Sequence, residues 1–68
     1  RFISKRGEGI QQLAIRVNDI ESTITQLIAS GVRMIDEHPV EGASGSIIAF
    51  VHPSSTGGVL VELVEHNN

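Results

Sequence analysis

The chain has no cysteine, tryptophan or tyrosine, and its 68 residues include only two phenylalanines and two prolines. Without cysteine there is no disulfide, and with so few aromatic rings the hydrophobic core is thin. A chain of this length buries only about 60% of the surface that it exposes when unfolded. We therefore expect one small domain of marginal stability, which a second copy or additional sequence supports.

Positively charged residues are also scarce. The chain has five Lys and Arg residues and eight Asp and Glu residues, so its net charge is −3. Binding to nucleic acid requires a basic surface that displaces counterions, so this class of partner is excluded. The basic residues Arg1, Lys5 and Arg6 are crowded at the N-terminus, just before Gly7. We expect this segment to be the solvated end of a helix, with a site for an anionic ligand as the alternative.

No apolar run approaches the ~20 residues that cross a bilayer, and no signal peptide is recognisable. We therefore expect a soluble, cytoplasmic protein with no membrane partner. The sequence starts abruptly at Arg1. We expect the chain to be a fragment or a processed piece of a longer protein.

The last third of the chain carries the strongest structural signal. Two apolar runs, 47–51 and 59–64, flank a connector, His52–Gly58, that is rich in serine and glycine. Pro53 ends the first run because it has no N–H to give to a strand, and the two glycines supply the positive φ angles that a reversing chain needs. The pattern predicts a β-hairpin.

A helix is predicted upstream of this hairpin. Asn18 or Asp19 caps it, with Glu21 completing a capping box from Asn18, and Gly31 follows its end. A stripe of apolar residues at helical spacing is expected to pack on a sheet: Ile20, Ile24, Leu27 and Ile28. Polar or small residues cover the opposite side, so the helix lies on one sheet face.

The remaining segments complete the sheet. Residues 10–17 alternate between apolar and polar and predict a strand, 32–35 reads as a short strand, and 36–45 reads as a loop. The fold class is therefore α+β, in which 1–68 forms a single βαβββ module with one helix on one face of a four-stranded mixed sheet. The predicted core between helix and sheet contains Leu13, Ile24, Leu27 and Val61.

The presence of a carboxylate, Glu62, within the apolar run 59–64 requires a physical explanation. Val61 and Leu63 flank it, and a partly buried carboxylate has to be paired, hydrogen-bonded or bound to a metal, because desolvating it alone costs several kcal/mol. Strand alternation places Gln12 and Glu62 on the sheet face opposite the helix, where they share a hollow if the first and last strands are close. Pairing of Glu62 with Arg16 or with a backbone N–H is the alternative.

Two stretches, GEGIQQLAIRVNDIEST and GASGSIIAFVHPSSTGGVLVELVE, resemble the C-terminal module of methylmalonyl-CoA epimerases. Those enzymes belong to the vicinal oxygen chelate superfamily, with glyoxalases, extradiol dioxygenases and bleomycin-resistance proteins. The resemblance implies a βαβββ module that pairs with a second module into a cup around a divalent metal ion (Co²⁺, Mn²⁺, Mg²⁺, Ni²⁺ or Zn²⁺). The partner is then either a second copy in a homodimer or an N-terminal module.

The resemblance also implies site residues. Glu62 matches the glutamate that ligates metal in the family, and Gln12 falls where the family pattern G-I-H-H-I-A-F has a histidine. Gln12 and Glu62 are thus the candidate metal ligands, and Glu62 is the candidate catalytic residue. An amide is a weaker donor than imidazole, and an oxygen-only ligand set suits Mg²⁺, Mn²⁺ or Ca²⁺ better than Zn²⁺.

The function implied is that of half a metal-dependent epimerase, which removes a proton beside the carbonyl of an acyl-CoA thioester such as methylmalonyl-CoA. A metal-free module that binds a small molecule and an inactive truncated remnant stay open as alternatives. His38, His52 and His66 lie in a loop, at a strand end and in the tail. Because their spacing does not converge, we expect no metal ligand among them.

Overall fold

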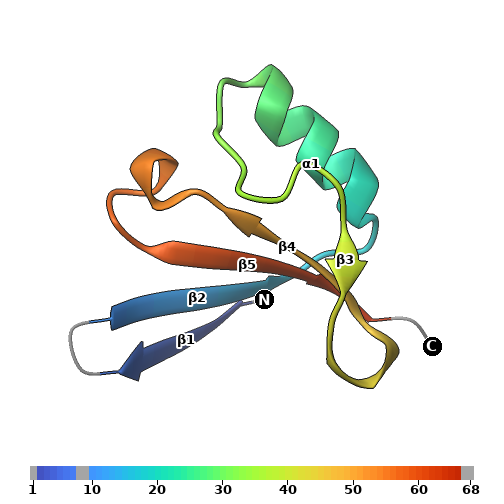
Figure 1. Ribbon diagram of the computed structural model, residues 1–68, viewed down its shortest axis with the longest axis horizontal. Coiled ribbons are helices and arrows are strands. Elements are labelled where there is room, and N and C mark those ends of the chain that lie inside the picture. The colour runs from blue at the N-terminus through green and yellow to red at the C-terminus, as the bar shows by residue number, and fades with distance from the viewer. Residues whose placement is uncertain (1, 8–9, 67–68) are drawn as a thin grey trace.

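The structure is a computed structural model that describes residues 2–7 and 10–66, with side chains described for 12–66. The elements in order are β1 (Phe2–Gly7), β2 (Ile10–Arg16), α1 (Ile20–Ala29), β3 (Val40–Glu41), the 3₁₀ turn η1 (Ala43–Gly45), β4 (Ile47–Val51), the 3₁₀ turn η2 (Pro53–Ser55) and β5 (Leu60–Glu65). The helix α1 lies on one face of the sheet (Figure 1), so the predicted α+β class is confirmed. Within the described ranges, no helix has the length and apolar character needed to cross a membrane.

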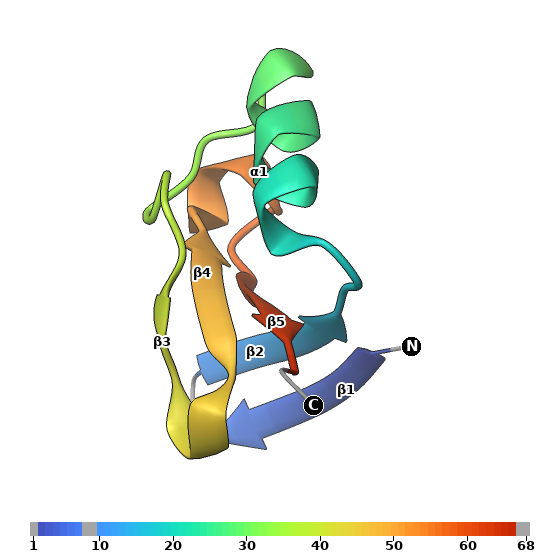
Figure 2. The same ribbon diagram turned by 90° about the vertical axis from the view of Figure 1, so that its right-hand side faces the viewer.

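The sheet has the strand order β1-β2-β5-β4-β3. β2 and β5 are parallel, and the other neighbouring pairs are antiparallel. The strands β2, β3, β4 and β5, with α1, have the predicted βαβββ order, although β3 lies within 36–45, which was predicted to be a loop. β1 adds a further strand beside β2. Figure 2 shows that the sheet twists strongly, so that β1 and β2 run across the direction of β4.

The prediction of a helix end at the N-terminus is wrong. The segment forms β1, which pairs with β2 from Phe2 opposite Ile15 to Gly7 opposite Ile10. Pairing with a neighbouring strand overrides the weak local preference of basic residues for a helix C-terminus. The alternative of an anion site concerns side chains outside the described part of the chain, those of Arg1, Lys5 and Arg6.

The strand predicted at 32–35 is also wrong, because this segment forms only an isolated bridge between Met34 and Val51. Just after it, the Asp36 N–H donates to the Phe50 carbonyl at 3.2 Å, and the Asp36 carboxylate accepts from the Phe50 N–H at 2.9 Å. A side chain thus takes the N–H that a regular neighbouring strand would use. The ladder is interrupted there and resumes only at the two-residue strand β3.

The helix α1 begins and ends close to the predicted positions. Of the two candidate caps, Asp19 is the one used, and its carboxylate accepts a hydrogen bond from the Ser22 N–H at 3.1 Å. A second contact comes from the end of β5, where the Glu65 carboxylate accepts from the Ile20 N–H at 2.8 Å. Gly31 follows the helix with a φ of 91°, a left-handed conformation that glycine adopts without strain.

The predicted β-hairpin is present as β4 and β5, which pair antiparallel from Ile47 opposite Glu65 to Val51 opposite Val61. The connector turns through η2, where the His52 side chain accepts a hydrogen bond from the Ser54 N–H at 3.0 Å. Two glycines with φ angles of 70° and 94° then lead into β5. The connector therefore has the turn chemistry that its composition indicates.

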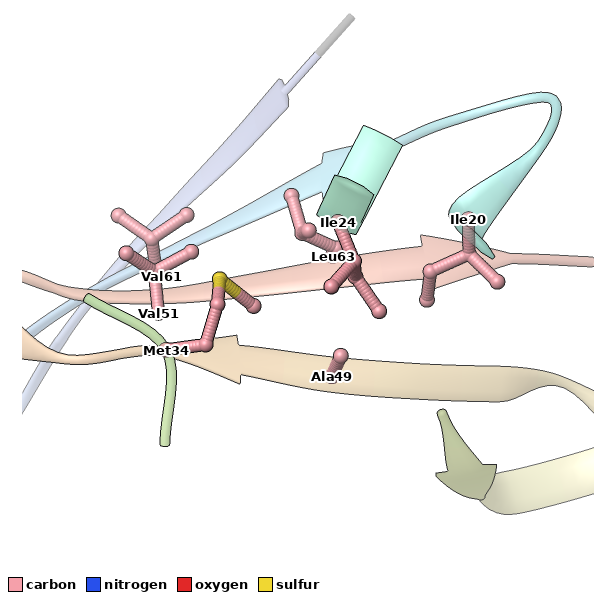
Figure 3. Close-up of a cluster of buried hydrophobic side chains, with 7 residues drawn as sticks. All are labelled: Ile20, Ile24, Met34, Ala49, Val51, Val61 and Leu63. Carbon is pink, nitrogen blue, oxygen red and sulfur yellow. The ribbon is translucent and has the colours of Figure 1, made fainter. Parts of the chain in front are cut away.

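The hydrophobic core lies between α1 and the sheet (Figure 3). Its buried members are Ile20, Ile24, Met34, Ala49, Val51, Val61 and Leu63. Leu13 and Leu27, which were expected in the core, are partly buried against this cluster. Ile28 is 43% exposed and lines a surface hollow beside Pro39, so the apolar stripe of the helix is narrower than predicted.

Candidate active site on the open face of the sheet

The parallel pairing of β2 with β5 builds the candidate site. In this pairing Gln12 lies opposite Leu60, and Ala14 lies opposite Glu62. On the other side of β5, Phe50 of β4 lies opposite Glu62. Alternate residues of β4 and β5 are buried beneath α1. Because strand side chains alternate, these five residues occupy the opposite face, which we call the open face.

Gln12 and Glu62 line the same hollow of about 20 Å³ on this face. The other lining residues are Leu13, Ala14, Phe50 and Leu60. Gln12 is exposed and Glu62 is half-buried. Sequence analysis did not identify Phe50 as part of the site. Phe50 joins the site because the register of the hairpin pairs it with Glu62. This register can be derived from the sequence only when the conformation of the connector is known.

The Glu62 carboxylate has no protein partner in the described part of the chain. Arg16 lies two residues beyond Ala14 on the same strand, yet neither its guanidinium nor a backbone N–H donates a hydrogen bond to Glu62 within residues 12–66. The predicted structural alternative for Glu62 is therefore absent from these residues. A half-buried carboxylate between apolar neighbours, with no partner among the side chains of residues 12–66, is a candidate to bind a ligand.

The donors fit one half of a metal site. A hard divalent cation takes about six oxygen ligands, and this face offers the amide oxygen of Gln12 and the carboxylate of Glu62. Among the residues that the structure describes, no group of three His, Cys, Asp or Glu could hold a metal ion alone. Further ligands would have to come from outside these described residues, for example from a facing module. The histidines lie elsewhere: His38 in the loop beside α1, His52 in the hairpin connector and His66 after β5.

Larger hollows flank α1, but their charged side chains are exposed or accept hydrogen bonds from the backbone of the helix. One of about 310 Å³ lies between the helix and segment 37–39, whose charged residues are exposed. Another of about 630 Å³ lies at the start of the helix, where Asp19 and Glu65 accept hydrogen bonds from backbone N–H groups of α1. The open face is therefore the better candidate site.

Comparison at the level of the family agrees with this geometry. The family model for the Glyoxalase/Bleomycin resistance protein/Dioxygenase superfamily matches residues 1–50. The chain belongs to this superfamily. Together with the homologues that cover most of the chain, this match confirms the resemblance seen in the two sequence stretches. Membership is consistent with the βαβββ order of β2 to β5, although it does not by itself assign a reaction.

Homologues named as methylmalonyl-CoA epimerases cover most of the chain. The mitochondrial methylmalonyl-CoA epimerase of Dictyostelium discoideum is 46% identical over 65 residues, which are 94% of this chain and 39% of that protein. The crystal structure of methylmalonyl-CoA epimerase from Mycobacterium tuberculosis has a TM-score of 0.79 and 44% identity, covering 84% of this chain and 38% of that one.

A third relative was solved with a bound ligand. It is a variant of Streptomyces coelicolor methylmalonyl-CoA epimerase in complex with 2-nitronate-propionyl-CoA, with a TM-score of 0.80 and 33% identity over 84% of this chain and 41% of that one. This chain therefore spans less than half the length of each of these three relatives.

Proposed function

We propose that this chain supplies one half of the active site of an epimerase that acts on an acyl-CoA thioester such as methylmalonyl-CoA. The observation that carries the proposal is the convergence of Gln12 and Glu62 on one hollow of the open face. Relatives named methylmalonyl-CoA epimerase, one of them in complex with an acyl-CoA derivative, support the choice of substrate.

Epimerisation removes the proton from the carbon beside the thioester carbonyl and returns it to the opposite face of that carbon. Negative charge develops on the carbonyl oxygen when the proton leaves, and positioned charges lower the barrier by stabilising it. One carboxylate cannot reach both faces of a carbon. Within this proposal, the acid and base groups therefore include at least one carboxylate of a facing module.

Gln12 and Glu62 would hold a divalent cation at this place. When bound, the cation supplies positive charge close to the developing oxyanion. Both residues offer hard oxygen donors, which favour Mg²⁺ or Mn²⁺ over Zn²⁺. A carboxylate beside a cation is a weaker base, because the positive charge lowers its proton affinity. We therefore assign Glu62 the role of ligand before that of base.

The apolar side chains of the open face are suited to contact with a partner module. This face presents a row of apolar side chains, and Val40 at its edge is 47% exposed. The other apolar members are Ile48, Phe50, Leu60 and Val64. Exposed apolar faces of this kind are usually covered in soluble proteins.

We expect the purified chain to self-associate at micromolar concentration through this face, which would make the second copy the partner module. Sedimentation velocity should show a species of about twice the mass of the 68-residue chain. Val64→Lys should shift the distribution toward monomer, because it places a charge on the face. A stable, folded monomer of the unmodified chain under these conditions would contradict the expectation.

Exchange of the substrate proton tests the proposed function. The chain is incubated with methylmalonyl-CoA and Mn²⁺ in D₂O, and mass spectrometry follows deuterium at the carbon beside the thioester carbonyl. Exchange should exceed the rate in buffer alone. Glu62→Gln should lower it by more than about tenfold, since even indirect ligand contacts are worth 10–100-fold in metal affinity. Glu37→Gln, the same change in an exposed loop, is the matched control.

The metal dependence of this loss separates the two roles of Glu62. If Glu62 is a ligand, raising the Mn²⁺ concentration should restore part of the exchange in Glu62→Gln. If it is the base, added metal should restore nothing. Equal exchange in Glu62→Gln and the unmodified chain would refute the proposal.

The second candidate function is a metal-free module that binds a small molecule without transforming it. The composition of the hollow favours it, since apolar Ala14, Phe50 and Leu60 surround only two polar groups and one of these is an amide. Binding sites for small molecules commonly have this mixture of apolar walls and few polar contacts. Thioester binding that is independent of metal and occurs without proton exchange would support this function over the epimerase.

A further inference from the structure

The four residues of β2 and β5 that surround the hollow on the open face differ in size, and one of them, Ala14, is small. Gln12 and Glu62 occupy one diagonal of a square formed by paired residues of β2 and β5, and Ala14 and Leu60 occupy the other diagonal. Three of the four corners thus carry long side chains, whereas Ala14 carries a single methyl group. On the far side of Glu62 stands the ring of Phe50. Glu62 is therefore flanked by the smallest residue of the hollow on one side and by the largest on the other.

The space that remains is small. The hollow has a volume of about 20 Å³, which is room for about one water molecule or one methyl group. Polar and apolar atoms contribute almost equally to its lining. Ala14, Phe50 and Leu60 are among the apolar residues, so a methyl substituent placed over Ala14 contacts carbon atoms. The γ atoms of any larger residue at position 14 would point from the same strand position toward this space.

The floor of the hollow is also rigid. β2 and β5 pair without interruption from Gln12 opposite Leu60 to Arg16 opposite Val64, and β5 pairs with β4 on its other side. Ala14 thus lies in a strand with paired neighbours and not in a loop that could move aside. A packed, hydrogen-bonded floor does not expand to admit an extra methylene group without strain.

We propose that Ala14 sets the size of the substituent accepted on the carbon that loses its proton. This inference rests on the proposed epimerase function, since it assumes that the reacting carbon lies beside Glu62. A hydrogen or a methyl substituent fits over Ala14, whereas an ethyl substituent does not. An apolar pocket discriminates about 10–200-fold for one methylene group. The preference for methyl over ethyl should fall in that range.

Three thioesters and two variants test the proposal. Malonyl-CoA, methylmalonyl-CoA and ethylmalonyl-CoA differ only in a hydrogen, methyl or ethyl substituent, and deuterium exchange above the buffer rate is measured for each with the full chain. Ala14→Val should lower exchange of the methyl compound relative to the hydrogen compound by about tenfold or more. Ala14→Gly should raise exchange of the ethyl compound relative to the methyl compound. Valine is a favourable strand residue, so the variant should fold.

Ala29→Val is the control, because it makes the same change at an exposed position of α1 that does not line the hollow. It should leave the ratios among the three thioesters unchanged. Unchanged ratios in both Ala14 variants, with exchange intact, would overturn the inference and leave the proposed function standing. The absence of binding and of exchange for all three thioesters with the folded, unmodified chain would overturn both.

Discussion

Ile24→Ala is expected to lower the free energy of unfolding by about 2–5 kcal/mol. The Ile24 side chain is 3% exposed and lies in the core cluster between α1 and the sheet (Figure 3). Strand pairing holds the far wall of this cluster, so the cavity left by the substitution cannot collapse fully. A 68-residue domain has a total stability on the order of 5 kcal/mol, and most of the variant should be unfolded. Urea unfolding followed by circular dichroism measures the change.

Gln26→Ala provides the control on the same helix. Gln26 is exposed, and among residues 12–66 its side chain makes one long hydrogen bond, of 3.4 Å to the Ser22 hydroxyl. Alanine is the best helix former, so the change in unfolding free energy should lie within about 0.5 kcal/mol. Both variants are compared with the unmodified chain at one protein concentration, because self-association would add to the apparent stability. Similar losses for Ile24 and Gln26 would show that the two faces of α1 are wrongly assigned.

Gln12→His is expected to strengthen the binding of Co²⁺ or Zn²⁺ by about tenfold or more, which is ~1.4 kcal/mol. A neutral imidazole is a better ligand for these cations than an amide oxygen. The new nitrogen would face the same hollow as Glu62, since Gln12 and Glu62 both line it. Glu62→Ala should abolish binding in both backgrounds. Isothermal titration calorimetry measures each affinity.

A variant with a histidine elsewhere on the surface is the control for nonspecific metal binding by histidine. Ser30→His places a histidine at an exposed position after α1 that lines neither this hollow nor the two hollows beside the helix. It should leave the affinity for Co²⁺ and Zn²⁺ at the level of the unmodified chain. If Gln12→His folds normally and binds these cations no better than Ser30→His does, the assignment of this hollow as a metal site fails.

Local sequence patterns were reliable where short-range interactions decide the structure. The cap at Asp19 and the glycine after the helix mark the ends of α1, because these residues satisfy backbone groups within a few positions of themselves. The strand predicted at 32–35 failed for a reason that lies outside the segment. There the Asp36 side chain bonds to the Phe50 backbone of β4. Such a contact depends on which strand happens to be adjacent.

The N-terminal strand β1 was also missed because its structure depends on contacts outside the segment. Its basic residues and Gly7 match the local chemistry of a helix end, yet the segment pairs with β2 along its whole length. Cross-strand hydrogen bonds form with residues that follow in the sequence, and their total outweighs a propensity worth a few tenths of a kcal/mol per residue. Composition alone cannot show whether cross-strand hydrogen bonds or local helix propensity contributes more.

The sequence by itself determined the helix, the hairpin and the faces on which the residues of β2, β4 and β5 lie, because these follow from the periods of the two structures and from turn chemistry. Only the tertiary structure decided that β2 lies beside β5, and in which register. Gln12 and Glu62 are distant in the sequence, and nothing local specifies the pairing of their strands. Burial of the apolar faces of both strands beneath α1 brings them together, and the register then places the methyl group of Ala14 beside the Glu62 carboxylate.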